Sequence, residues 1–120
     1  MKKLPHNYKG VLELVGATVH AYRCFGSYQG DWLAKITWKG TDGWVRGGYG
    51  SCSGCDTIQW IQDEIPVDEQ EEEFRRIALT YYLDNILTQD DVEAYAKKNL
   101  EWDMDAQDMI DFVKENSWNN

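Results

Sequence analysis

The sequence is short of proline, cysteine and histidine. Two prolines among 120 residues, with no low-complexity stretch, leave no visible linker between separate units. We therefore expect one domain spanning residues 1–120. Three cysteines are an odd number, which fits a reducing compartment better than a disulfide framework. The two histidines lie in no nucleophile motif, so the sequence predicts a protein that is not an enzyme.

Patterns that direct a chain to a membrane are also missing. No segment reaches the ~18 consecutive apolar residues of a membrane-spanning helix. The segment from Met1 to His6 contains two lysines and lacks the apolar core of a secretory signal. The sequence therefore favours the cytoplasm, of a bacterium or of an infected host, and predicts no membrane partner.

Positive charge is scarce and unevenly placed. The net charge is −9, yet residues 1–50 carry seven Lys and Arg against three acids, and residues 51–120 carry five against eighteen. Because nucleic acids are held mainly by cations, the acidic total argues against nucleic acid as the direct partner. The simplest explanation of the excess of acidic residues is that they keep the protein soluble. The alternative is that they form a surface that binds another protein.

The first half of the chain has the pattern of a small β-sheet. A short helix is predicted over residues 8–15, and a strand rich in β-branched and aromatic residues over 18–25. Strands over 32–38 and 44–49 flank a turn cluster at 39–43, which predicts an antiparallel hairpin. In the first hairpin strand, side chains alternate between two faces. The expected buried face comprises Trp32, Ala34, Ile36 and Trp38, and the opposite face carries Leu33, Lys35 and Thr37.

The second half has helical periodicity. Pro66 separates a short helix over 56–63 from a longer one that begins with acidic residues. The expected buried face of the longer helix comprises Phe74, Ile77, Ala78, Tyr81, Tyr82 and Ile86. Thr88 is the expected N-cap of the next helix, with Asp91 at the capping-box position, and a last helix begins at Asp105 with Met109, Ile110 and Val113 inward. We expect an α+β fold in which about three helices cover one face of the sheet.

Two glycine-rich segments, residues 26–31 and 47–56, carry the most specific strings of the chain, GSYQGD and GGYGSCSGCD. With the GWV between them, they resemble a signature of small uncharacterised proteins from bacteria and their phages. The resemblance covers roughly residues 26–56, and it implies a bacterial or phage origin without an activity. A looser likeness concerns residues 30–32, 43–45 and Tyr49, which are similar to paired strands of bacterial SH3-type barrels that bind peptides or wall fragments.

The cysteines raise the question of a metal. Cys52 and Cys55 form a CxxC pair that can present two thiolates to zinc, with Cys24 as a third ligand and His20 or His6 as a fourth. No second CxxC is present, and no βαβ pattern supports a redox role. We expect no cofactor and regard these cysteines as small packed residues, with zinc as the alternative.

The glycine-rich loops suggest a small-ligand site. Backbone N–H groups in such turns, at the start of a helix, can bind a phosphate or nucleotide. The side chains expected around it are Tyr28, Gln29, Asp31, Tyr49, Ser51, Ser53 and Asp56. The P-loop pattern is missing, and Asp56 would repel an anion. A ligand at these loops is the alternative to a protein partner.

Acidic residues exceed what solubility requires on the predicted helices. The expected contact residues are Asp68, Glu69, Glu71, Glu72, Glu73, Asp90, Asp91 and Glu93. Carboxylates on a helix can stand in for phosphates and steer association with a basic groove. The leading hypothesis is a non-enzymatic inhibitor or modulator of a host protein, such as a nucleic-acid-binding defence enzyme of the CRISPR type.

Overall fold

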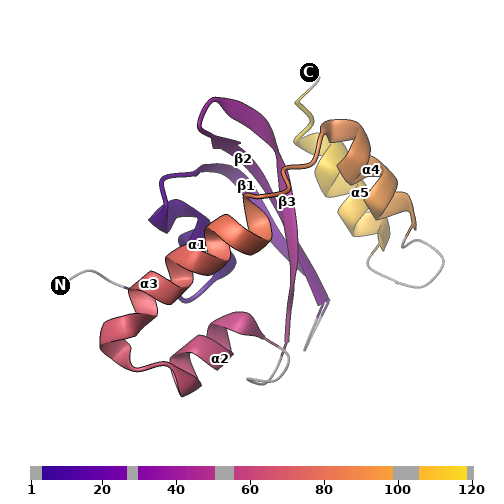
Figure 1. The fold of residues 1–120 in the computed structure, drawn as a ribbon. Helices are drawn as coiled ribbons and strands as arrows, with labels where there is room; N and C mark the ends of the chain where they lie inside the picture. Colours follow the sequence, from indigo (N-terminus) through magenta and orange to yellow (C-terminus); the bar gives the residue numbers. More distant parts are fainter. Residues whose placement is uncertain (1–3, 27–29, 51–55, 99–105, 119–120) are drawn as a thin grey trace.

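The computed structural model describes residues 4–26, 30–50, 56–98 and 106–118. They form an α+β fold, as predicted (Figure 1). The elements are α1 (Tyr8–Leu14), β1 (Thr18–Gly26), β2 (Gly30–Trp38), β3 (Thr41–Tyr49), α2 (Thr57–Glu64), α3 (Val67–Ile77), the π-helical turn η1 (Ala78–Tyr82), α4 (Gln89–Lys98) and α5 (Ala106–Glu115). In the described ranges, four α-helices follow the sheet, whereas about three were predicted. Over the described ranges, no helix combines the length and the apolar character needed to cross a membrane.

The three strands form an antiparallel sheet in the order β1-β2-β3. The predicted hairpin is β2–β3, and its turn is tighter than expected. Lys39 and Gly40 have φ values of 48° and 80°, which suit a two-residue hairpin turn, so β3 already begins at Thr41. In β1 the pairing register shifts between Val19 and Ala21, which marks a bulge at the intervening residue.

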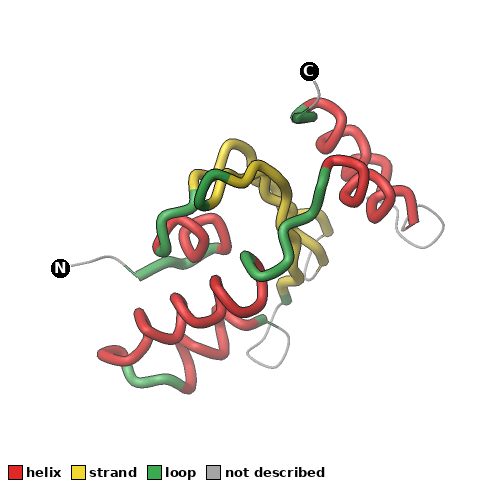
Figure 2. Tube along the Cα trace, turned by 45° about the horizontal axis from the view of Figure 1, so that its top comes forward, coloured by secondary structure: helices red, strands yellow, loops and turns green. Residues whose placement is uncertain are grey.

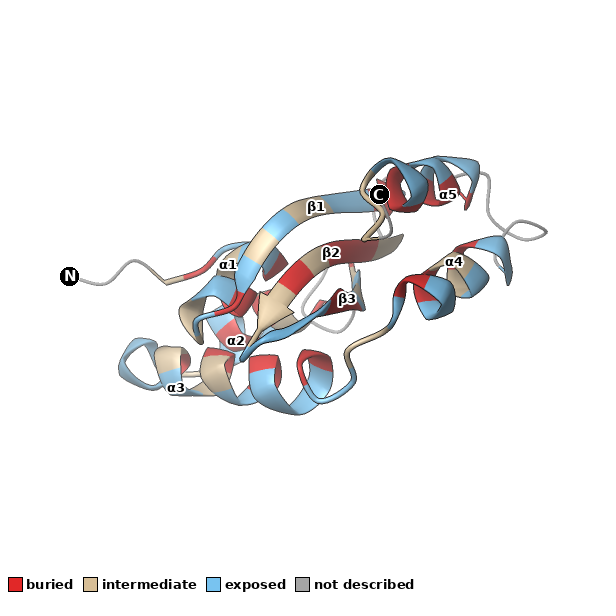
Figure 3. Ribbon diagram, turned by 90° about the horizontal axis from the view of Figure 1, so that it is seen from above, coloured by how far each residue is buried: buried red, intermediate tan, exposed pale blue. Residues whose placement is uncertain are grey.

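Helices pack on both faces of the sheet (Figure 3). Trp32 and Ile36 lie in a core with α1, α2 and α3, whereas Leu33 and Trp44 lie in a second core with α4 and α5. The prediction that the helices cover one face is therefore wrong. Residues 32–34 are all fully buried, as expected for a strand covered on both sides rather than the half-buried strand that was predicted.

The end of α3 departs from regular α-helix geometry. The N–H of Leu83 donates to the carbonyl of Ala78, five residues earlier, at 2.9 Å. This wider turn changes which side chains face inward. Tyr82 is 8% exposed, but Tyr81 is 56% exposed, so the prediction that Tyr81 lies in the buried face is wrong.

The predicted start of α4 is confirmed. Thr88 Oγ1 accepts a hydrogen bond from the backbone N–H of Asp91 at 3.1 Å, and Asp91 Oδ2 accepts one from the N–H of Thr88 at 3.3 Å. This reciprocal pair is a capping box. The apolar face predicted for the last helix is also buried in α5: Met109, Ile110 and Val113.

Gln89 attaches the α4–α5 pair to the sheet. Its Oε1 accepts hydrogen bonds from Trp44 Nε1 at 2.8 Å and from the backbone N–H of Trp118 at 3.1 Å. Its Nε2 donates to the carbonyl of Val113 at 3.3 Å. Leu87 adds a backbone bridge to Trp44, and Figure 2 shows this connecting segment leading from η1 to α4. The amide of a single buried glutamine thus satisfies polar groups from the sheet, α5 and the tail.

Candidate functional site

The residues predicted for ligand and metal binding are partly brought together by the structure. Cys24, Tyr49 and Asp56 line one cavity beside α2, together with Tyr8 and Tyr22. Asp31 is not part of it, because it lies in β2 opposite Phe25 and Gly48, on the face that α4 and α5 cover. The remaining residues of these predictions, Tyr28, Gln29, Ser51, Cys52, Ser53 and Cys55, lie outside the described ranges.

Asp56 is a structural carboxylate at the edge of this cavity. It is 9% exposed, and its Oδ1 accepts hydrogen bonds from the Tyr8 hydroxyl at 2.7 Å and from the N–H of Ile58 at 3.0 Å. Its Oδ2 accepts one from the N–H of Gly50 at 3.0 Å. Asp56 is therefore the N-cap of α2 and joins that helix to α1 and to the end of β3. These bonds occupy the carboxylate, so it is poorly placed to bind a ligand.

Three tyrosines around this region have raised pKa values. Burial, followed by the hydrogen bond to Asp56, raises the pKa of Tyr8 well above its usual range. Burial, followed by the Cys24 thiol, does the same for the pKa of Tyr22, and burial raises the pKa of Tyr82 to about 12. The neutral phenols are thus part of the folded core.

These shifts predict a loss of stability in alkali. An unfolded tyrosine releases its proton at about pH 10, whereas Tyr82 retains its proton to about pH 12. Above about pH 10 the unfolded chain therefore binds fewer protons than the folded one, and the free energy of unfolding falls as the pH rises. Thermal melting at about pH 8 and about pH 11 should show a lower Tm in alkali, and Tyr82→Phe should reduce the difference. Equal Tm values at both pH values would contradict this cause.

Cys24 and His20 do not converge on one metal. Cys24 is an exposed thiol whose Sγ lies 3.3 Å from the Tyr22 hydroxyl, on the side of α1 and α2. His20 sits at the β1 bulge, 2.8 Å from Thr37 Oγ1 through its Nε2, with its ring 5.3 Å from that of Trp118. The bulge turns His20 to the other face of the sheet, so His20 is not placed to share a metal site with Cys24, as the zinc alternative would require. His6 does line the same cavity as Cys24. Among the residues that the structure describes, no group of three or more His, Cys, Asp or Glu is placed to hold a metal.

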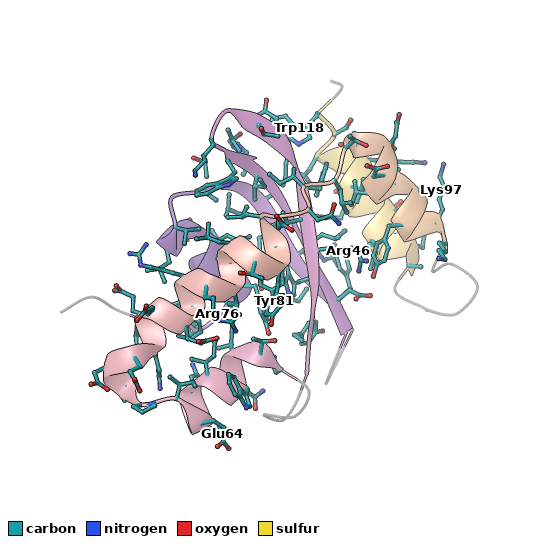
Figure 4. The ribbon with its side chains drawn as sticks, in the orientation of Figure 1. Arg46, Glu64, Arg76, Tyr81, Lys97 and Trp118 are labelled. Atoms are coloured by element: carbon teal, nitrogen blue, oxygen red, sulfur yellow. The ribbon has the colours of Figure 1, made fainter. Side chains whose placement is uncertain are left out.

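Cations of the sheet contact the α4–α5 side of the molecule. The pairs are Arg23 with Asp108 at 4.0 Å, Lys35 with the ring of Trp118 at 4.4 Å, and Arg46 with the ring of Tyr95 at 4.2 Å. Figure 4 shows Arg46 between β3 and α4. Cation–π contacts of this kind are worth about 0.5–1 kcal/mol at exposed sites. Three of the seven cations of residues 1–50 thus contact α4, α5 or Trp118 in the tail.

The predicted acidic contact residues fall on two sides of the sheet. Those from Asp68 to Glu73 lie on α3, while Asp90, Asp91 and Glu93 lie on α4 (Figure 3). They therefore do not form one continuous surface. Asp91 is moreover engaged in the capping box of its own helix.

Residues 57–82, which we name the α2–η1 unit, concentrate negative charge. They carry seven acids against two arginines. Arg75 pairs with Glu71 at 3.5 Å, and Arg76 pairs with Glu73 at 2.7 Å between Nε and Oε1. Asp68, Glu69 and Glu72 are exposed, so they are the most accessible of the predicted α3 contact residues.

The same unit carries exposed apolar side chains that the sequence analysis did not single out as a binding surface. Among the described residues, the large hydrophobic side chains classed as exposed all lie in the α2–η1 unit: Trp60 (42%), Val67 (75%), Leu79 (45%) and Tyr81 (56%). Scattered exposed hydrophobic residues are ordinary, so it is their restriction to this one acidic unit that makes the unit a candidate binding surface.

Compared with protein-family models, curated proteins and solved structures, the chain has no match.

Proposed function

We propose that this chain is a non-enzymatic binding protein of bacterial or phage origin, and that its α2–η1 unit binds a basic surface of a host protein. The observation that carries the proposal is the coincidence, in residues 57–82, of a net charge of −5 with the exposed apolar side chains. Carboxylates attract a basic partner over several ångströms, whereas apolar side chains stabilise the complex once water is excluded.

The proposed effect is that the chain inhibits or modulates its partner by occupying the partner's basic groove. Basic grooves that bind nucleic acid recognise phosphates spaced along a backbone. Glu69 and Glu72, one turn apart on α3, present two carboxylates from a fixed helical framework. The proposed target class is a host enzyme that binds nucleic acid, with a CRISPR-type defence enzyme as the leading example.

Net charge supports α3 rather than α4 as the contact helix. In α4, Lys97 and Lys98 in the last turn offset Asp90, Asp91 and Glu93, and the helix has a net charge of −1. In α3, five acids against Arg75 and Arg76 give a net charge of −3, and both arginines are paired with glutamates of the same helix. The proposed contact residues are therefore the acidic residues predicted on α3: Asp68, Glu69, Glu71, Glu72 and Glu73.

Reversing Glu69 and Glu72 to lysine should greatly reduce capture of the partner. These two residues are exposed, whereas reversing Glu71 or Glu73 would also break an ion pair within the helix. We expect the association rate to fall by about tenfold or more at low salt, because exposed interface charges act mainly on association. The measurement is a tagged pull-down from nuclease-treated bacterial lysate at low and raised salt, read by mass spectrometry.

The matched control carries the same charge change on the other side of the sheet, as Asp90→Lys with Glu93→Lys. It should retain the partner, and circular dichroism should show both double variants folded. A protein captured equally by the wild type and the Glu69→Lys/Glu72→Lys variant, in a salt-independent way, would contradict the proposal.

The cavity lined by Cys24, Tyr49 and Asp56 supports a second candidate function, the binding of a metal, phosphate or nucleotide. It is favoured by the convergence of three residues that the sequence analysis had assigned to ligand or metal binding. It ranks second because the Asp56 carboxylate is occupied by internal hydrogen bonds. If no protein is retained under any salt condition, this cavity becomes the better candidate.

A further inference from the structure

The π-helical turn η1 brings Tyr81 to the surface. Tyr81 follows Ile77 by four residues and Phe74 by seven, a spacing that in a regular helix would place it beside those two buried side chains. The wider turn instead carries Tyr82 into the core and leaves Tyr81 more than half exposed. Turns of this kind are rare and occur frequently at functional sites.

Arg76 restrains the exposed ring. Its guanidinium lies 5.6 Å from the centre of the Tyr81 ring, and its Nε donates to Glu73 Oε1 at 2.7 Å (Figure 4). The Glu73 carboxylate also raises the pKa of Arg76. A ring that is already held in position loses less conformational freedom when a partner covers it.

Tyr81 lies next to a shallow acidic depression. Ile65 at the end of α2 lines it, with Glu69, Glu72, Glu73 and Arg76 from α3. Arg76 belongs both to this depression and to the contact with Tyr81. An exposed aromatic side chain therefore stands beside a surface that carries three carboxylates and one paired arginine.

We infer that Tyr81 is the apolar anchor of the contact made by the α2–η1 unit, and that the partner is a protein with an aliphatic side chain set within a basic surface. This inference rests on the proposed function. The charges favour a basic partner by complementarity, and tyrosine is among the residues that carry most binding energy at interfaces. The carboxylates accelerate association, whereas the ring slows dissociation.

Two synthetic helical peptides of equal positive charge serve as probes, one with a central leucine and one with serine in its place. Stopped-flow fluorescence anisotropy gives both rate constants. The wild type should bind the leucine peptide about tenfold more tightly, through slower dissociation, a difference that corresponds to about 1.4 kcal/mol. Tyr81→Ser should remove this preference, and Tyr81→Phe should keep it. Thr80→Ala is the matched control, because Thr80 is an exposed residue of the same turn that is not among the exposed apolar side chains, and it should also keep the preference.

The outcomes separate this inference from the proposed function. Equal binding of the two peptides by the wild type, or a leucine preference that survives in Tyr81→Ser, overturns the assignment of Tyr81 as the anchor. If both peptides still bind in a salt-dependent way, the proposal of an acidic binding surface stands. No salt-dependent binding of either peptide contradicts both. Analytical ultracentrifugation tests a further outcome. If the wild type is a dimer and Tyr81→Ser is a monomer, the Tyr81 ring contacts a second copy of the chain, and the inference is also overturned.

Discussion

Replacing Asp56 by alanine is expected to lower the free energy of unfolding by about 3 kcal/mol or more. The substitution removes the N-cap of α2, a loss of about 1 kcal/mol. It also leaves the buried Tyr8 hydroxyl and the Gly50 N–H without their acceptor, and each buried group left unsatisfied costs about 1–3 kcal/mol. Urea denaturation followed by circular dichroism measures the loss.

Asp91→Ala is the matched control for Asp56→Ala. Asp91 also bonds a backbone N–H at a helix start, but it is exposed, and within the described ranges its side-chain hydrogen bond is to Thr88, three residues earlier. We expect a loss of about 1 kcal/mol or less there. Similar losses in the two variants would show that the hydrogen bonds from Tyr8 and Gly50 contribute little, against the role given to Asp56.

Gly47→Ala is expected to destabilise the fold by about 2–3 kcal/mol. A Cβ at this position would lie 2.6–2.7 Å from three atoms of the Trp32 indole, which is fully buried. Trp32 cannot move aside easily, because the rings of Tyr8 and Tyr82 each lie 5.0 Å from it and that of Tyr22 lies 6.0 Å away. Overpacking a dense core typically costs about 1–3 kcal/mol. Chemical denaturation compares the variants directly.

Gly48→Ala provides the control for this clash. The nearest atom to a Cβ at Gly48 is the carbonyl oxygen of Gly30 at 3.6 Å, an ordinary contact distance. A Gly-to-Ala change without strain is neutral or stabilising by about 0.4–1 kcal/mol. A Gly47→Ala protein as stable as Gly48→Ala would mean that the packing of Trp32 against Gly47 is loose.

Local sequence patterns predicted much of the fold. The capping box of Thr88 and Asp91, the β2–β3 hairpin and the buried face of α5 each depend on residues close in sequence. Their hydrogen bonds and apolar spacing therefore follow from short-range rules.

Long-range packing determined what the sequence pattern missed. Leu33 was expected opposite the buried face of its strand, but α4 and α5 return across the sheet and cover it. Tyr81 was expected in the core because regular helical spacing was assumed, and the π-helical turn shifts that spacing by one residue. Neither the return of a distant helix pair nor the turn has a signal in neighbouring residues.

The candidate site shows the same division. The acidic residues of α3 were identified from sequence, but only the structure shows that those of α4 lie on the other side of the sheet. The convergence of Cys24, Tyr49 and Asp56 on one cavity joins residues from β1, β3 and the start of α2. The bulge at His20 interrupts the alternation of side chains between the two faces of β1. Assigning His20 and Cys24 to one face from sequence depends on that alternation.

The most direct test of the acidic binding surface is the salt dependence of affinity for the basic leucine-containing peptide. We predict that the affinity of the wild type and of the Asp90→Lys/Glu93→Lys control falls steeply with rising salt. The Glu69→Lys/Glu72→Lys variant should bind weakly at every salt concentration and show a shallow slope. The same affinity and slope in all three proteins would contradict the assignment of binding to the α2–η1 unit.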